Sequence, residues 1–410
     1  MNIQITPAPL CGVATAPTSK SAAHRALICA AFADAPGSLQ IKDSSEDLIA
    51  TANCLRALGA AVQSIGETWT VIPPKTLPAK ATLDCGESGS TLRFLLPVAA
   101  ACGVAVTCTG HGRLPQRPMQ PLLEVLRAHG CTVNDGFPLR CVGRLQGGCF
   151  VIDGCMSSQF TTGLLLALPL CGRDSTLTVR PPLASGPYVD ITLEILAQYG
   201  VPVVRNELQF MVPAAKYRSR EYTVEGDWSN AAFWLCAGVP VRGLRLDSPQ
   251  GDKKILSVLQ AFGAVIRTEN DLISADVSSL HGTIVDAADI PDLVPIIAAV
   301  AATAAGTTTI CHAAHLRFKE SDRIRTTVQM LRALGADAEE TDDGLRITGV
   351  PRLSGGVVDG CGDHRIVMAA AIAALRCTSP VTICGAQAVN KSYPRFFEEY
   401  SRLGGLVHVL

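Results

Sequence analysis

A unit of about 70 residues recurs six times along this chain. Six times, a short polar segment opens an Ala/Leu-rich stretch; the segments begin at Ser19, Ser88, Ser157, Asp227, Pro291 and Asp363. Ser, Asp and Pro before an apolar run are typical of a helix start. A helix start carries unpaired N–H groups and a partial positive charge, so it attracts anions. Six such ends made by one repeating unit can therefore converge on a single, heavily anionic ligand.

A second marker repeats in phase with the first. In each repeat, Gly follows an apolar residue by four positions, at Gly59, Gly130, Gly200, Gly263, Gly335 and Gly404. The steps between these glycines are 71, 70, 63, 72 and 69 residues. Gly at this place is typical of a helix end in the left-handed conformation, with a strand to follow. The two markers share one period, which indicates a true sixfold repeat.

The repeat predicts an α/β protein of two domains. Each unit has the pattern strand, buried helix, strand, amphipathic helix, strand, strand. In the first unit we expect helices over 22–32 and 47–58, and a strand over 69–72 that ends at a Pro-Pro pair. The one short step, of 63 residues, brackets the polar stretch 216–221, which suggests a domain junction. Three repeats on each side give two related halves, and ligands often bind between such halves.

Composition excludes several classes of protein. Only 17% of residues are charged and the net charge is −1, so we expect neither a nucleic-acid nor a membrane partner. The sixteen cysteines stand singly in apolar stretches, which favours buried thiols in a reducing cytoplasm over disulfides or zinc sites. No secretory signal pattern is visible, and the apolar runs are too short to span a bilayer. We therefore expect a cytoplasmic protein.

Phosphate-binding loops of the nucleotide-binding kinds are missing from the chain. Neither G-x-x-x-x-G-K-[ST] nor a G-x-G-x-x-G after a strand occurs. ATP and NAD are thereby disfavoured, and we expect no cofactor and no metal.

Charge is scarce, so its clusters are informative. The richest clusters are 319–323, with two cations beside two carboxylates, and 363–365, which leads a very apolar helix. Cations beside carboxylates suit anion binding combined with proton transfer. A capped helix end or a solvated turn is the alternative interpretation of each segment. His24, His111 and His281 are isolated in the sequence, and no role is assigned to them.

In this order, the segments resemble the 5-enolpyruvylshikimate-3-phosphate synthase family over essentially the whole chain. The matching segments are Lys20-Ser21 with Arg25, Gly89 with Arg93, 117–119, 157–159, 187–192, 319–323, 363–365 and 391–394. The resemblance implies a two-domain, inside-out α/β barrel-like fold with three βαβαββ repeats in each domain. It implies a discontinuous domain of 1–18 plus 226–410, an inserted domain of 19–225, and an active site in the cleft between them.

The resemblance also implies the reaction. Members transfer the enolpyruvyl group of phosphoenolpyruvate to the 5-hydroxyl of shikimate 3-phosphate and release phosphate, by addition and elimination through a tetrahedral ketal. The implied catalytic residues are Asp292, Glu320 and Lys20. Those implied for shikimate 3-phosphate are Lys20, Ser21, Arg25, Ser157, Ser158, Gln159, Ser185, Asp292, His315 and Lys319. Those implied for phosphoenolpyruvate are Lys20, Gly89, Arg117, Gln159, Arg323, Arg365 and Lys391. We expect a monomer with two small-molecule substrates.

Two positions depart from the family pattern. His315 stands where many members have Asn against the shikimate ring, and Glu87 stands where Asn is common beside the phosphoenolpyruvate loop. Members with Gly at the Gly89 position are usually sensitive to glyphosate, so we expect sensitivity here, with Glu87 and Phe94 as the neighbours that can modify it.

Three other functions fit the chain less well. The sister enolpyruvyl transferase that acts on UDP-N-acetylglucosamine carries a Cys in the loop before its Arg-Pro, and the loop 110–116 here has none. RNA 3′-phosphate cyclase has related repeats but needs a nucleotide. A non-catalytic anion-binding scaffold requires cations but not both Asp292 and Glu320, so their joint presence favours an enzyme.

Overall fold

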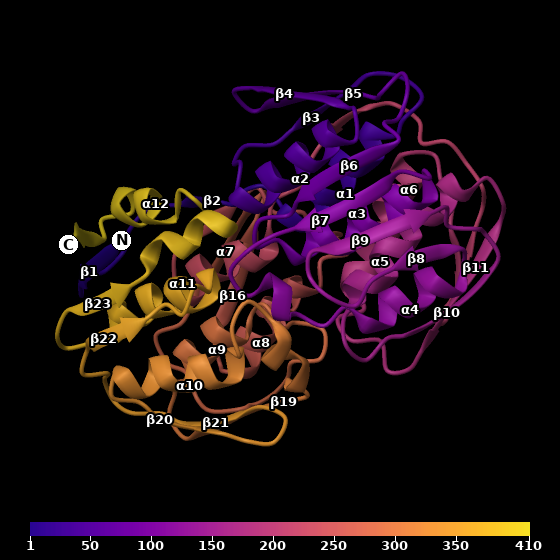
Figure 1. The fold of residues 1–410 in the computed structure, drawn as a ribbon. Helices are drawn as coiled ribbons and strands as arrows, with labels where there is room; N and C mark the ends of the chain where they lie inside the picture. Colours follow the sequence, from indigo (N-terminus) through magenta and orange to yellow (C-terminus); the bar gives the residue numbers. More distant parts are fainter. The chain divides into compact units, whose positions relative to one another are not determined.

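The computed structural model describes all 410 residues, which divide into two compact units. The discontinuous unit comprises Met1–Pro17 and Glu225–Leu410, and the inserted unit comprises Thr18–Val224. Each unit holds three four-stranded sheets and its own hydrophobic core. In both units the sheets lie on the outside and helices fill the interior (Figure 1).

The inserted unit contains the first three repeats. Its sheet orders are β14-β3-β5-β4, β6-β7-β9-β8 and β10-β11-β13-β12. Its strands are β3 (Gly37–Gln40), β4 (Ala61–Ile65), β5 (Thr68–Ile72), β6 (Lys80–Asp84), β7 (Ala105–Thr109), β8 (Cys131–Val133), β9 (Leu139–Gly143), β10 (Cys149–Asp153), β11 (Ser175–Arg180), β12 (Val204–Asn206), β13 (Gln209–Val212) and β14 (Glu221–Thr223). Its helices are α1 (Lys20–Ala31), α2 (Glu46–Ala57), α3 (Gly89–Ala101), η1 (Leu114–Gln116), α4 (Gln120–Ala128), α5 (Ser158–Ala167), η2 (Leu168–Cys171) and α6 (Pro187–Gln198).

The discontinuous unit contains the other three repeats. Its sheet orders are β16-β17-β15-β2, β18-β19-β21-β20 and β22-β23-β1-β24. Its strands are β1 (Asn2–Thr6), β2 (Ala14–Thr15), β15 (Val241–Arg242), β16 (Val265–Glu269), β17 (Leu272–Asp276), β18 (Ile284–Asp286), β19 (Thr307–Cys311), β20 (Asp337–Glu340), β21 (Leu345–Thr348), β22 (Gly356–Asp359), β23 (Val381–Cys384) and β24 (Leu406–Val409). Its helices are α7 (Trp228–Cys236), η3 (Gly251–Lys254), α8 (Ile255–Ala261), α9 (Val294–Ala301), η4 (Ala314–Phe318), α10 (Arg323–Ala333), α11 (His364–Ala373), η5 (Ala374–Arg376), η6 (Ala386–Lys391) and α12 (Phe396–Arg402).

Every repeat has one βαβαββ topology, which confirms the predicted fold class. In the second repeat, β6 and β7 pair in parallel, β9 pairs antiparallel with β7, and β8 takes the edge. Segments distant in the sequence complete three of the sheets. The N-terminal strand β1 lies between β23 and β24, β2 pairs in parallel with β15, and β14 pairs in parallel with β3. As a result, the two ends of the chain lie side by side on one sheet (Figure 1).

The helix starts follow the predicted pattern in five repeats and differ in one. Ser19, Ser88, Ser157, Asp227 and Asp363 each accept a backbone N–H from the first turn of the helix they open. The fifth repeat is the exception, because α9 begins at Val294 after Leu293 and has no capping side chain. The predicted start at Pro291 and Asp292 is therefore wrong, and the Asp292 carboxylate pairs with arginines instead.

The helix ends follow the predicted pattern in all six repeats. Each of the six marker glycines has a positive φ, between 80° and 98°. In the first repeat, Ala60 N–H bonds the Leu55 carbonyl at 3.0 Å and Gly59 N–H bonds the Arg56 carbonyl at 2.9 Å. This pair of bonds closes the helix and turns the chain into the next strand. The helices that start from the polar segments are apolar all round, as expected for helices buried on every side.

Candidate functional site

Lys20 begins α1 and pairs with Asp47 in the first turn of α2. Its Nζ donates to Asp47 Oδ2 at 2.7 Å, with the two side chains only 16% and 14% exposed. Ser19 caps the same helix by accepting the Ala22 N–H. Because both charges are largely removed from water, this pair is held more firmly than a surface ion pair.

Arg25, one turn further along α1, is fully buried among neutral groups. Its guanidinium donates to the Thr192 hydroxyl at 2.8 Å and to the Tyr188 carbonyl at 2.9 Å, and lies over the Phe94 ring at 5.0 Å. Burial lowers the Arg25 pKa to about 9, although Tyr188 and Cys29 oppose that shift. No carboxylate is among its hydrogen-bond partners, so a bound anion would relieve the cost of burying this charge.

A glutamine joins two helix starts of the inserted unit. Gln159, in α5, accepts from Arg93 Nη1 at 2.6 Å and donates to the Ser90 hydroxyl at 3.0 Å. Arg93 also donates to the Pro118 carbonyl at 2.8 Å and lies over the Phe160 ring. The start of α3, the start of α5 and the loop before α4 are thereby locked together.

The loop before α4 places Arg117 against the start of α3. A Cβ built on Gly89 would lie 2.7 Å from Arg117 Nη1, which is closer than any real Cβ contact. Glycine therefore leaves room for this guanidinium at the helix start, and any larger residue at position 89 would displace it.

Three serines predicted to bind phosphate come from two loops of the third repeat. Ser157 accepts the Gln159 N–H at the start of α5, and the neighbouring Ser158 is buried. Ser185 precedes α6 with a φ of 56°, a conformation that is costly for a residue other than glycine. The Ala184 N–H bonds the Gly154 carbonyl at 3.0 Å, which holds the two loops together.

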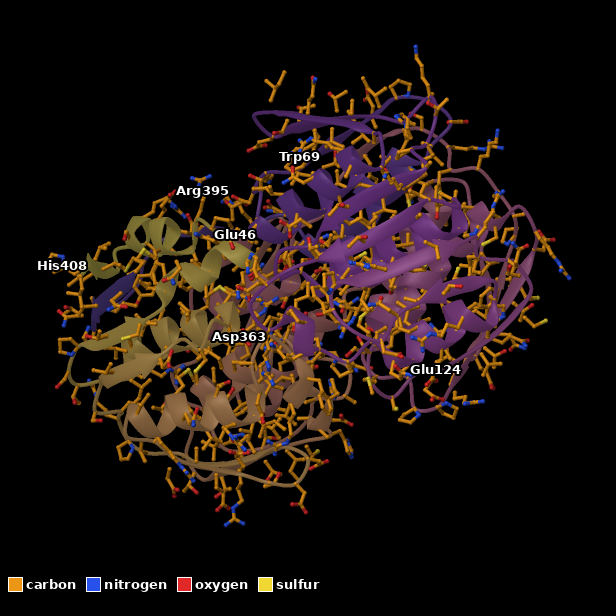
Figure 2. All side chains as sticks on the ribbon, in the orientation of Figure 1. Glu46, Trp69, Glu124, Asp363, Arg395 and His408 are labelled. Carbon is orange, nitrogen blue, oxygen red and sulfur yellow. The ribbon has the colours of Figure 1, made fainter.

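In the discontinuous unit, one buried arginine binds three carboxylates. Arg323, at the first turn of α10, is 1% exposed and contacts Asp292 at 2.6 Å, Glu320 at 2.7 Å and Asp363 at 2.8 Å. Figure 2 shows Asp363 within this unit, whereas Arg395 lies at its surface. Burial opposes the charge of Arg323, but the three carboxylates outweigh it and raise its pKa well above the ordinary value. Removing one member of such a network costs about 3–5 kcal/mol.

Arg365 links this network to a second helix start. Its guanidinium contacts Asp292 Oδ2 at 3.1 Å and the Asn230 side-chain oxygen in α7 at 3.3 Å. Burial alone would raise the pKa of Asp292, but Arg365, Arg323 and Lys319 together lower it well below the ordinary value. Asp292 is therefore ionised and held between two guanidiniums, although it lies far from both in the sequence.

Two further predicted residues lie at the edges of this network. Lys391 is buried, and its Nζ donates to the Gly362 carbonyl at 2.7 Å, just before α11. His315, in η4, is largely buried, and its Nε2 has no hydrogen-bond partner. Burial, followed by the charge of Lys319, lowers the His315 pKa to about 4, so its ring is neutral at pH 7.

Sequence analysis missed one acid of this site. Asp252, in η3, is buried, and burial followed by the charge of Asp292 raises its pKa to about 7. It belongs to the short segment 251–254, which leads into the second helix of its repeat, α8, and is not one of the six polar segments that open the buried helices, so that pattern did not point to it. Glu87, which departs from the family pattern, lies outside this network. Its Oε1 is 3.8 Å from Nδ1 of the exposed His111.

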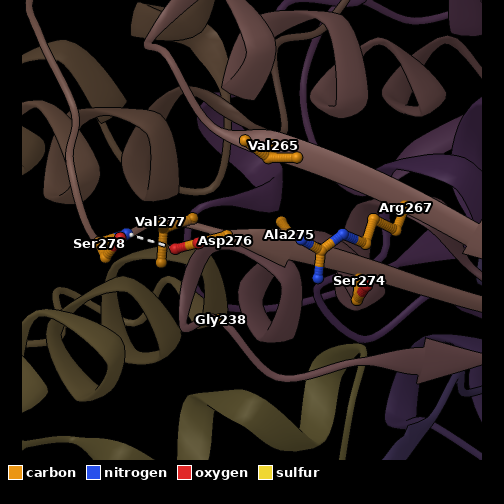
Figure 3. A pocket seen from close by; sticks show the side chains of 8 residues that line it. All are labelled: Gly238, Val265, Arg267, Ser274, Ala275, Asp276, Val277 and Ser278. Carbon is orange, nitrogen blue, oxygen red and sulfur yellow. Dashed lines mark hydrogen bonds between the residues drawn. The ribbon is translucent and has the colours of Figure 1, made fainter.

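Two surface pockets lie away from the charged clusters around Lys20, Arg25 and Arg323. A hollow of about 420 Å³ in the discontinuous unit is lined by β16 and β17 residues such as Arg267 and Ser274 (Figure 3). A second, of about 710 Å³, is lined in the inserted unit by residues such as Phe32 and Arg144. Neither contains a predicted site residue. No group of three or more His, Cys, Asp or Glu side chains is arranged to hold a metal ion, and none of the helices meets the length and hydropathy needed to cross a membrane.

Comparison with solved structures defines the class of protein. EPSP synthase from Acinetobacter baumannii matches with a TM-score of 0.81 and 25% identity, over 100% of both chains. The enolpyruvyl transferase NikO from Streptomyces tendae matches with a TM-score of 0.79 and 20% identity, over 99% of this chain and 98% of that one. The fold, with basic side chains at its buried helix starts, is that of the enolpyruvyl transferases.

Sequence comparison narrows the class to one family. The family model for EPSP synthase (3-phosphoshikimate 1-carboxyvinyltransferase) matches residues 5–400. The 3-phosphoshikimate 1-carboxyvinyltransferase of Clostridium novyi is 40% identical over 99% of this chain and 98% of its own length. That of Clostridioides difficile is 36% identical over the same shares. The chain belongs to the EPSP synthase family.

Proposed function

We propose that the two charged clusters, one from each unit, act together on the substrates of this family. The reaction is transfer of the enolpyruvyl group of phosphoenolpyruvate to the 5-hydroxyl of shikimate 3-phosphate, giving 5-enolpyruvylshikimate 3-phosphate and phosphate. The observation that carries the proposal is the single buried Arg323 that gathers three carboxylates, Asp292, Glu320 and Asp363. Carboxylates held among cations can move protons while the anionic substrates stay neutralised.

Shikimate 3-phosphate takes the serines and two cations, Arg25 and Lys319. Ser157, Ser158, Ser185 and Lys319 hold its phosphate, and Ser21 with Arg25 holds its carboxylate. The support for Arg25 is its burial among neutral acceptors, which leaves its charge for an anion. The support for Ser157 and Ser158 is their place at a helix start, where N–H groups face outward.

Phosphoenolpyruvate takes the cations beside the other helix starts. Arg117, Arg323, Arg365 and Lys391 hold its phosphate and carboxylate beside the Gly89 backbone, with Gln159 between the two substrates. The support for Gly89 is the space that Arg117 occupies against it. When an anion engages Arg323 and Arg365, these arginines release Asp292 from its two ion pairs. The Asp292 pKa then rises toward its ordinary value, and the carboxylate becomes a better base.

The proton transfers follow from this exchange of partners. Asp292 takes the proton of the 5-hydroxyl group while the hydroxyl oxygen bonds to C2 of phosphoenolpyruvate. Glu320 gives a proton to the methylene carbon of phosphoenolpyruvate. The ketal then loses phosphate, which leaves with the proton held by Asp292, and returns one methyl proton to Glu320, so both carboxyl groups regain their starting states. Lys20, fixed by Asp47, assists by neutralising charge on the departing phosphate.

We further propose that the protein works as a monomer in a reducing cytoplasm. All sixteen thiols are free and eight of them are buried, as thiols in a reducing compartment are.

His315 takes the place beside the shikimate ring, where a neutral imidazole can accept or donate one hydrogen bond.

Phosphate release tests the function directly. Enzyme mixed with phosphoenolpyruvate and shikimate 3-phosphate should release one phosphate per product, and UDP-N-acetylglucosamine offered in place of the shikimate should release none. Calorimetry with shikimate 3-phosphate, followed by glyphosate, should show tighter glyphosate binding in the presence of the first ligand. Release with the UDP-sugar, or binding without turnover, would replace the proposal with the sister transferase or a scaffold.

A further inference from the structure

Three buried hydroxyls form a continuous chain through the inserted unit. Thr51 of α2 lies 2.7 Å from the Thr91 hydroxyl of α3, and Thr91 donates to the Ser88 hydroxyl at 2.8 Å. The far end of the chain is His24 of α1, whose Nδ1 lies 2.7 Å from the Thr51 hydroxyl. All four side chains are at most 1% exposed, so water cannot replace these bonds.

Counting protons fixes the tautomer of His24. The Thr91 hydroxyl has one proton, and it serves Ser88 at 2.8 Å or the Asp47 carbonyl at 3.4 Å. Either hydroxyl can donate in the contact between Thr91 and Thr51, and because the Thr91 proton is directed to Ser88, we assign this contact to the Thr51 proton. Thr51 then has only an acceptor to offer His24, so the imidazole must donate from Nδ1. This assignment comes from the hydrogen-bond network.

The rest of the His24 ring agrees with a neutral Nδ1–H form. Its Nε2 is buried and has no partner, which is less costly for an acceptor than for a charged donor. The ring meets Phe94 edge to face, at 6.4 Å between centroids, and Phe94 also lies beneath Arg25. Burial, with Lys20 and Arg25 as further causes, lowers the His24 pKa well below its ordinary value.

Each member of the chain lies within a turn of a proposed site residue. Lys20 is one turn before His24 on α1, and Asp47 is one turn before Thr51 on α2. Gly89 lies between Ser88 and Thr91 at the start of α3. The chain thus ties together the three helices that carry the Lys20–Asp47 pair and the Gly89 backbone.

We propose that His24 is a positioning residue: its Nδ1–H orders the hydroxyl chain Thr51–Thr91–Ser88 and so holds Lys20, Asp47 and Gly89 in place for phosphoenolpyruvate. His24 touches no substrate in this role, and it acts through the three hydroxyls. The kinetic part of its test rests on the proposed function, whereas the tautomer does not.

Steady-state kinetics separate positioning from folding. His24→Leu and Thr51→Val should each raise KM for phosphoenolpyruvate about tenfold, since each breaks a buried hydrogen bond that orders the helix starts. His24→Asn, whose amide can donate from near the Nδ1 position, should restore KM to within about threefold of wild type. Thr161→Val is the matched control, because Thr161 is a buried helical threonine of the same unit whose hydroxyl has no partner. Calorimetric stoichiometry with shikimate 3-phosphate counts the competent sites in each variant.

The outcomes divide cleanly. The positioning role is supported if His24→Leu and Thr51→Val both raise KM for phosphoenolpyruvate while the binding stoichiometry stays full. It also requires that His24→Asn restores KM. A fall in stoichiometry with KM unchanged, or no difference from Thr161→Val, would overturn it.

Nitrogen-15 NMR of the wild-type imidazoles gives a second measurement that needs no activity. His24 should be protonated at Nδ1 from pH 6 to 8, and an Nε2–H form would refute the assignment even if His24→Leu fails to fold. Wild-type enzyme without turnover would count against the proposed function and leave the NMR test intact.

Discussion

The guanidinium of Arg117 occupies the space that any side chain on Gly89 would need. A Cβ on Gly89 would lie 2.7 Å from Nη1 and 2.9 Å from the central carbon of that guanidinium. Gly89→Ala should therefore displace Arg117, raise KM for phosphoenolpyruvate about tenfold or more and weaken glyphosate binding, with shikimate 3-phosphate affinity unchanged. Competition kinetics measure all three constants. Equal phosphoenolpyruvate constants in wild type and variant would mean that Arg117 does not contact this substrate.

Glu320→Gln should slow turnover and spare binding. The change removes a proton donor but keeps the size of a side chain that contacts Arg323 at 2.7 Å. General acid catalysis contributes about 10²–10⁴-fold, so phosphate release should fall by that order while shikimate 3-phosphate still binds. Glu398→Gln is the control, since Glu398 pairs with the exposed Arg395 at the surface. Unchanged turnover in Glu320→Gln would remove Glu320 from the mechanism.

Lys20→Ala should weaken both binding and rate. Lys20 forms a largely buried ion pair with Asp47, and its loss leaves that carboxylate uncompensated beside two anionic substrates. We expect at least a hundredfold loss of kcat/KM, on the order of 3 kcal/mol. Lys254→Ala provides the comparison, because Lys254 forms an equally short pair with Asp289 that is half exposed. If both variants keep wild-type kinetics, the Lys20 segment is only a helix end.

His315→Asn should reduce the pH dependence of stability. The folded His315 has a pKa of about 4, below the 6.5 of an unfolded histidine, so the unfolded chain binds more protons between these values. This histidine therefore lowers stability as the pH falls from 6.5 toward 4. Between pH 7.5 and pH 5, the loss in free energy of unfolding should be smaller in His315→Asn by about 1–2 kcal/mol. Urea unfolding at the two pH values measures it, and parallel losses in both proteins would contradict it.

Gly59→Ala should destabilise the inserted unit by about 1–2 kcal/mol, the cost of a left-handed conformation for a residue with a Cβ. Gly59 has a φ of 96° at the end of α2, and its Cβ would also come within 3.2 Å of Pro74. Gly136→Ala is the control in the same unit, because Gly136 has no such φ and nothing within 4 Å of an added Cβ. Urea unfolding of both variants should show a loss only in the first; equal midpoints would remove the strain argument.

The helix boundaries were predictable because the bonds that make them are local. A capping Ser or Asp bonds an N–H two or three residues ahead, as Ser88 does with Thr91, and the closing glycine permits a bond from Ala60 back to Leu55. Residue types a few positions apart therefore carry this information. The helix start predicted at Asp292 was wrong, because the Asp292 carboxylate pairs with Arg323 and Arg365 and does not cap α9.

The order and number of the repeats and the buried helices could thus be inferred from the amino-acid sequence alone, and the resemblance to a known family supplied the charged residues that we propose for the site. Only the tertiary structure decided which charged and polar side chains contact one another. Arg323 contacts carboxylates from positions 292, 320 and 363, and Asp252 has a pKa of about 7. His24, to which the sequence assigned no role, ends a buried hydroxyl chain. Apart from the local contact between Glu320 and Arg323, these features depend on distances and desolvation between groups that lie tens of residues apart, and no local pattern encodes them.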